Sequence, residues 1–167
     1  MLGEQLGTLT GKIVNKRVVN VTGSPQIEFN VSTAGKVRQI EVTELHTYTS
    51  EQRSGGTQYG TTNGIIMTKD GTEYVTFTGH GTGYVDEARK MRYAGSIFFK
   101  SLSAGKIGFL TNVFGVFEND VDESDNIVIR VGSGSSRTRY SEGLEFALGF
   151  YPNKPILYVY FIILFWI

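Results

Sequence analysis

The stretch MRYAGSIFFKSLSAGKIGFLTNVFGVFENDVDESDN, residues 91–126, decides the fold. It predicts two long strands, at 91–102 and 106–121, that fold back on each other at Ser103-Ala104-Gly105. The second strand is apolar on both faces for most of its length, which is typical of a strand covered from two sides. The rest of the chain must therefore be arranged to cover this hairpin.

The residues before this hairpin favour further strands joined by tight turns. Period-two alternation is clearest at 26–32, where Ile27, Phe29 and Val31 share one face. Lys69-Asp70-Gly71 predicts a hairpin turn, because Asp-Gly tolerates the positive φ that such turns require. The predicted strands cover residues 8–22, 26–32, 36–49, 58–68, 73–85, 91–102, 106–121 and 127–131.

About eight strands in up-and-down order indicate an all-β protein. The connections are short, and one of them is a turn expected at Ala34-Gly35. No segment shows sustained 3.6-residue periodicity, so we expect few and short helices. Long strands with hairpin connections favour a small antiparallel up-and-down β-barrel over a two-sheet sandwich, because closure removes exposed edges. We expect this barrel domain to span residues 1–131.

Composition limits the class of protein. The 167 residues are enough for one domain, and 40% hydrophobic with 19% charged residues indicates a globular chain. The balance of 16 basic and 16 acidic residues argues against nucleic acid and against an anionic membrane surface. The absence of cysteine excludes disulfides, thiolate metal sites and a cysteine nucleophile. The first residues lack a basic stretch followed by an apolar one, so we expect a cytoplasmic location.

Residues 132–167 form an atypical C-terminal tail. The linker-like GSGSSRTR at 132–139 leads to an ending, Ile156–Ile167, that is continuously apolar over twelve residues. A membrane-spanning helix needs roughly twenty apolar residues, so we expect no membrane span. The composition is that of a buried strand or an aggregation-prone segment. It therefore predicts association between chains, either as a homo-oligomer or through the tail itself.

Three strings in the chain resemble a family of small uncharacterised prokaryotic proteins. They are GIIMTKDG at 64–71, GHGTGY at 79–84 and the stretch at 92–126, and the resemblance covers residues 36–131. It implies a barrel like that of allene oxide cyclase, which is related to the lipocalin-like barrels, and it implies no activity. Family members tend to end in a Trp-rich, charged segment, whereas this chain departs at Gly132. That departure favours the hypothesis that residues 132–167 are a replaced terminus.

Glu118 and Asn112 are the candidates for acid–base catalysis. We expect both on one face of the strand at 106–121, together with Leu110, Phe114 and Val116. A carboxyl group in a barrel cavity can transfer protons, and an amide beside it can position a water or polarise a carbonyl. The alternative places Glu118 at the rim in water and gives Asn112 a backbone hydrogen bond.

The candidates for ligand binding come from three strands. Glu44 and His46 follow Ile40 on one face of the strand at 36–49, which predicts a polar cavity wall. Glu41 and Glu44 are second choices for acid–base chemistry. His80 and Tyr84 alternate with Gly79, Gly81 and Gly83, so they project from the opposite face to the glycines. Either the glycines keep the wall thin and His80 points into a site, or they allow the strand to bend and His80 faces solvent. Phe114 is the apolar candidate on the strand at 106–121.

No cofactor or metal is predicted. The two histidines could join Glu44 or Glu118 in a two-His, one-carboxylate site, but their spacing does not require it. An aromatic excess of 11 Phe and 9 Tyr favours a module that binds a small apolar or amphipathic ligand in the barrel. Two alternatives stay open: a cyclase- or isomerase-like enzyme acting on a hydrophobic substrate in the same cavity, and a filled barrel with a structural or interaction role.

Overall fold

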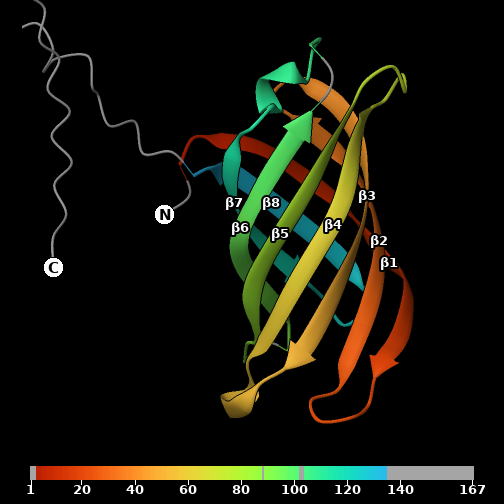
Figure 1. Cartoon of the computed structure of the whole chain (residues 1–167), viewed down its shortest axis with the longest axis vertical. Helices are drawn as coiled ribbons and strands as arrows, with labels where there is room; N and C mark the ends of the chain where they lie inside the picture. The colour runs from red at the N-terminus through yellow and green to blue at the C-terminus, as the bar shows by residue number, and fades with distance from the viewer. Residues whose placement is uncertain (1–2, 88, 102–103, 135–167) are drawn as a thin grey trace, which may run out of the picture. The chain divides into compact units, whose positions relative to one another are not determined.

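A computed structural model of the chain describes residues 3–87, 89–101 and 104–134. Eight antiparallel strands follow one another around a closed barrel, and the last strand pairs with the first (Figure 1). The predicted all-β barrel is therefore confirmed. The strands are β1 (Gln5–Asn20), β2 (Gln26–Val37), β3 (Ile40–Gln52), β4 (Gln58–Thr68), β5 (Tyr74–Val85), β6 (Met91–Ser101), β7 (Phe114–Val121) and β8 (Asn126–Ser133).

Two short 3-10 helices, η1 (Ser54–Gly56) and η2 (Gly108–Leu110), are the helices in the described part of the chain. Within that part, no helix is long and apolar enough to cross a membrane. The barrel closes where Gln5 to Lys12 of β1 run antiparallel to Gly132 to Asn126 of β8. The last strand thus continues two residues past the expected boundary at residue 131, and the tail from residue 135 onward lies outside the described residues.

Period-two alternation sends one face of each strand into the barrel. Leu9, Val31, Val75 and Ile127 are almost completely buried, and their neighbours along each strand are more exposed. A single hydrophobic core of such inward side chains runs through the described barrel. Each inward aliphatic side chain of this size stabilises the fold by roughly 1.5–3 kcal/mol relative to an exposed one. The interior is therefore mostly filled, which limits the space for a ligand.

The turn expected at Ala34-Gly35 is wrong, because β2 continues through both residues to Val37. The strand pair β2–β3 turns instead at Arg38-Gln39, where Arg38 has a φ of 52°. Gly35 is opposite Leu9 of β1, and a Cβ there would overlap the Thr8 carbonyl oxygen. This glycine therefore marks a close approach between two strand backbones rather than a turn.

The strand expected at 106–121 is wrong in its first half, because β7 begins only at Phe114. Residues before it form a loop around η2 that lies at the upper end of the barrel (Figure 1). The Glu73 carboxylate accepts hydrogen bonds from the backbone N–H groups of Lys106 and Ile107, which fixes the start of this loop. Ile107 and Leu110 are completely buried. The apolar run thus covers the end of the barrel and is not a strand buried on two faces.

Candidate functional site

A polar cluster lies inside the barrel on the inward face of β3. Glu44 and His46 are buried there, as the expected polar wall on that strand requires. The Glu44 carboxylate accepts a hydrogen bond from the Thr33 hydroxyl of β2, and its Oε1 lies 3.1 Å from Nδ1 of His46. An ionised carboxylate only accepts, so Nδ1 of His46 is the donor in this contact. The other ring nitrogen of His46, Nε2, makes no hydrogen bond within the described segments.

Aromatic rings continue the interior wall beside this cluster. Tyr48 stacks on Phe29 with ring centroids 4.6 Å apart, and it meets Tyr93 edge-on at 5.8 Å. Tyr93 donates its hydroxyl to Oε1 of Gln58 and also contacts Oγ of Ser50. Burial raises the pKa of both tyrosine hydroxyls above the usual value, so each stays protonated across the physiological range. These two tyrosines therefore present O–H groups and never phenolates to the interior.

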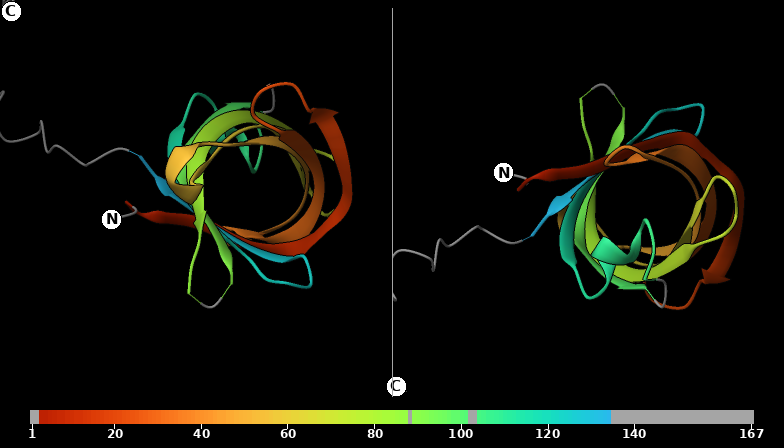
Figure 2. Two further views of the ribbon diagram at one scale, coloured as in Figure 1. Left: turned by 90° about the horizontal axis from the view of Figure 1, so that it is seen from below. Right: turned by 90° about the horizontal axis from the view of Figure 1, so that it is seen from above.

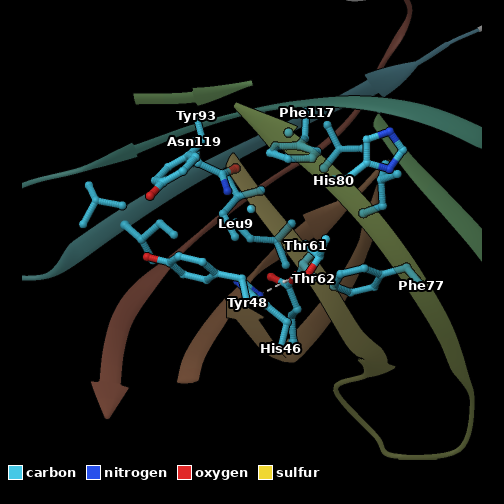
Figure 3. Close-up of a pocket in the computed structure, with 18 of the residues that line it drawn as sticks. Leu9, His46, Tyr48, Thr61, Thr62, Phe77, His80, Tyr93, Phe117 and Asn119 are labelled. Atoms are coloured by element: carbon cyan, nitrogen blue, oxygen red, sulfur yellow. Dashed lines mark hydrogen bonds and ion pairs between the residues drawn. The ribbon is translucent and has the colours of Figure 1, made fainter. Parts of the chain in front are cut away.

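The polar cluster and the aromatic rings border one cavity of about 50 Å³ (Figure 3). Most of its other lining is aliphatic. The lining residues are Leu9, Glu44, His46, Tyr48, Gly60, Thr61, Thr62, Ile66, Phe77, His80, Gly81, Tyr93, Ile97, Phe117, Asn119, Val121, Ile127, Ile129 and Val131. A cavity of this size has room for roughly three or four water molecules. The 3-10 helix η2 lies over one side of the upper end of the barrel, as the view from above shows (Figure 2).

Asn119 of β7 brings an unsatisfied acceptor to the cavity. Its side-chain Oδ1 is buried and finds no hydrogen-bond partner among the described residues. The Tyr48 hydroxyl likewise makes no hydrogen bond to a described residue, although Tyr93 beside it makes two. A buried polar atom without a partner costs about 1–3 kcal/mol. An occupant that donates a hydrogen bond to Oδ1 of Asn119 would recover part of that cost.

Glu118, Asn112 and Phe114 lie away from this cavity. Glu118 and Phe114 are exposed on the outer face of β7, because Phe117 and Asn119 are the residues of that strand that line the interior. Asn112 is exposed in the loop before β7, with a φ of 57°. The expected shared inward face of Asn112 and Glu118 is therefore wrong. The prediction of a shared face is wrong because it extends the strand alternation through residues 106–113, which are not strand.

The two candidates on β5 also have exposed side chains. Tyr84 is 53% exposed, and the His80 ring contacts Oγ of Ser96 on the neighbouring strand at 3.3 Å. His80 still borders the cavity, since its neighbour Gly81 leaves only backbone between the interior and the outer face. His46 inside and His80 outside therefore do not converge. No group of three potential metal ligands occurs among the described residues.

Sequence reasoning missed Thr33, Tyr93 and Asn119. Asn119 alternates with Phe117 and Val121, and Tyr93 alternates with Gly95 and Ile97, so each belongs to a face with apolar residues. That period-two pattern was available in the sequence. It did not identify the inward face of β7, because the opposite face also carries apolar side chains at Phe114 and Val116.

The fold and the site together define an antiparallel eight-stranded barrel with a small, mostly apolar interior and one buried Glu–His pair. No family model and no curated protein matches the chain. Solved structures do resemble it. A protein with unknown function from Clostridium acetobutylicum ATCC 824 is 13% identical with a TM-score of 0.68, covering 81% of this chain and 100% of its own.

A conserved protein of unknown function from Rhodopseudomonas palustris is also 13% identical, with a TM-score of 0.64, covering 80% of this chain and 97% of its own. Identities this low establish a shared fold and carry no activity.

Proposed function

We propose that this protein is a binding module that takes a small amphipathic ligand into the barrel interior. The observation that carries the proposal is the unpartnered Oδ1 of Asn119 in a cavity that also receives His46 and Tyr48. Sites for small molecules combine apolar walls with a few convergent polar groups, and this interior has that composition.

The ligand must be small. Pockets for drug-sized molecules have volumes of about 300–1,000 Å³, whereas this cavity has about 50 Å³. A larger ligand would have to displace Tyr48 or Tyr93, and the second of these is fixed by hydrogen bonds to Ser50 and Gln58. A ligand of a few non-hydrogen atoms fits without displacing either tyrosine ring.

A second candidate function is proton transfer by the Glu44–His46 pair. The Glu44 carboxylate contacts Nδ1 of His46, and a neutral His46 ring would have Nε2 available as a base. Tyr48, protonated because burial raises its pKa, could donate a hydrogen bond to a substrate oxygen beside it. In this second candidate function, Glu44 and His46 on the inward face of β3 take the acid–base role that the sequence analysis gave to Glu118 and Asn112. Binding remains the first proposal because it needs only the cavity and its unpaired groups.

Native mass spectrometry of the protein purified from its own host tests the proposal, together with NMR of labelled protein titrated with small neutral fragments and xenon. We expect a co-purifying small molecule, or fragment-dependent shifts at cavity residues such as Gly60 and Gly81. Asn119→Leu should reduce these shifts, whereas Glu118→Gln, the exposed neighbour on the same strand, should leave them unchanged. No bound species and no cavity shifts would show an interior filled only by side chains and water.

A further inference from the structure

The two ends of the barrel differ in how much packing a ligand would disturb on entry. At the upper end, Ile107 and Leu110 of the loop around η2 are completely buried, and the Glu73 carboxylate accepts two backbone hydrogen bonds from that loop. The lower end is the end at which β3 finishes and β6 begins (Figure 1). Near it, the rings of Tyr48 and Tyr93 border the cavity. Entry from below therefore requires the movement of a ring and leaves the buried loop in place.

Tyr93 and Tyr48 are held in place differently. Tyr93 is 9% exposed, and its hydroxyl contacts both Gln58 and Ser50. Tyr48 is only partly buried, and its hydroxyl makes no hydrogen bond to a described residue. Its ring is held by stacking on Phe29 and by contacts with two further rings. Rotation of the Tyr48 side chain therefore breaks no hydrogen bond within the described barrel, whereas movement of Tyr93 breaks two.

Apolar side chains continue from Tyr48 toward solvent at the lower end. Ile27 lies two residues from Phe29 on β2 and therefore on the same face, and Val18 of β1 is paired with Ile27. Ile27 is 37% exposed and Val18 is 64% exposed. The pairing of β1 with β8 ends at Lys12, so this part of β1 extends beyond the closed barrel. A ligand that took the place of the Tyr48 ring would therefore meet an apolar surface on its way to solvent.

Gly60 faces the same cavity from β4, the strand next to Tyr48. It pairs with the buried Ser50, so a side chain at this position would point into the interior. An added Cβ would lie 3.3 Å from the Thr49 carbonyl oxygen and would meet no other atom within 4 Å apart from its chain neighbours. A methyl group at Gly60 would therefore reduce the room for a ligand without a severe clash.

We infer that Tyr48 closes the cavity at the lower end of the barrel and sets the upper size limit of its ligand. This inference rests on the proposed function, because it concerns the ligand of the same cavity. It goes beyond that function by naming the residue that determines ligand size. Ligands that fit the cavity of about 50 Å³ bind with the ring in place, and longer ligands are excluded unless the ring is removed.

A series of unbranched alcohols from methanol to n-hexanol tests this size limit, because its members differ only in length. NMR titration of the full chain measures the dissociation constant of each alcohol from the shifts of cavity residues such as Gly81. Each added methylene that fits should strengthen binding by up to about fourfold. In the wild-type protein we expect the affinity to rise over the first members and to fall again before n-hexanol, since the longer chains do not fit beside Tyr48.

Tyr48→Val should remove the limit and strengthen the binding of n-hexanol by about tenfold or more, because the added methylene groups can then reach Phe29 and Ile27. Tyr48→Leu retains more of the packing on Phe29 and gives the same comparison with a smaller change in side-chain volume. Tyr48→Phe keeps the ring and should keep the wild-type limit. Gly60→Ala should shift the limit toward shorter alcohols.

An affinity that rises steadily to n-hexanol in the wild-type protein would overturn the inference without any variant and would leave the binding module standing. A wild-type limit that persists in Tyr48→Val or in Tyr48→Leu would overturn it as well, and so would an equal change of the limit in Tyr48→Phe. Absence of binding by every alcohol and by xenon, in the wild-type protein and in the variants, would overturn both the inference and the proposed function.

Discussion

Oε1 of Glu44 lies 3.1 Å from Nδ1 of His46 inside the barrel, and each of these side chains is only 5% exposed. The Thr33 hydroxyl occupies the other carboxylate oxygen. Thr33, Glu44 and His46, on two neighbouring strands, are therefore linked by two contacts in an interior that is otherwise largely apolar. In such surroundings the loss of one member exposes the others to the full cost of burial without a partner.

A double-mutant cycle on Glu44 and His46 should measure this coupling. Glu44→Ala leaves Thr33 and His46 unpaired and should lower the free energy of unfolding by about 1–3 kcal/mol. Removing His46 as well should cost less than the sum of the single changes, with a coupling of about 0.5–3 kcal/mol. Urea unfolding of the four proteins gives the values. Additive single changes would show that the two side chains contribute independently.

The position of this pair could be predicted from the sequence, and the reason is local. Alternation along residues 36–49 puts Glu44 and His46 on the same face as Ile40 and Val42. Because β3 is paired along both edges, with β2 and with β4, this face of the strand can point into the barrel. The all-β class could be predicted in the same way, from period-two alternation and from turns such as Asp70-Gly71, whose conformation depends only on the residues of the turn.

The errors arose where a local pattern has two physical causes. The apolar run with Ile107 and Leu110 looks the same whether it forms a doubly covered strand or a cap over the barrel end. Only the Glu73 carboxylate, which binds the start of the loop, distinguishes the two, and its contact is distant in sequence. The inward face of β7 likewise depends on its pairing with β6, which period-two alternation alone does not fix.

The buried cap can be tested directly. Leu110→Ala removes a completely buried side chain at the upper end of the barrel and should destabilise the protein by about 2–5 kcal/mol. Phe98→Ala removes a larger side chain that is 50% exposed on the outer face of β6, and it should cost clearly less. Urea midpoints of both variants give the comparison. A smaller loss of stability for Leu110→Ala than for Phe98→Ala would contradict a stabilising role of the buried loop around η2.

Asp70 in the β4–β5 turn predicts a specific dependence of stability on pH. Hydrogen bonds from Thr68 and Thr72, together with Lys106, hold its pKa well below the usual 3.8. The folded state therefore favours the ionised carboxylate. The resulting stability is present above pH ~4 and is lost as the pH falls from there toward the lowered pKa.

Asp70→Asn should lower the urea midpoint at pH 7, and the difference from wild type should shrink steadily between about pH 4 and pH 2. Unfolding curves across this pH range measure the effect. Glu87→Gln, an exposed carboxylate on the β5–β6 connection, serves as the matched control. A difference between wild type and Asp70→Asn that stays constant down to pH 2 would show that ionisation of Asp70 does not contribute to folding.

Gly81 is required by a close approach of β5 to β6. It lies opposite Gly95, and a Cβ at Gly81 would lie 2.5 Å from the carbonyl oxygen of Ala94 and 3.1 Å from Cα of Gly95. Backbone cannot move aside as a flexible side chain can, so Gly81→Ala must separate the two strands. We expect a destabilisation of about 1–3 kcal/mol or more, measured by urea unfolding.

Gly60→Ala provides the matched comparison, because Gly60 faces Gly81 on the adjacent strand and its added Cβ would meet nothing closer than 3.3 Å, at the Thr49 carbonyl oxygen. That contact needs a shift of only a few tenths of an ångström, so the substitution should cost less than the one at Gly81. Both glycines border the cavity, so a shared effect on ligand binding would not explain a difference in stability. Equal destabilisation by the two substitutions would show that the strands separate as easily at one position as at the other, and that Gly81 does not set the spacing between β5 and β6.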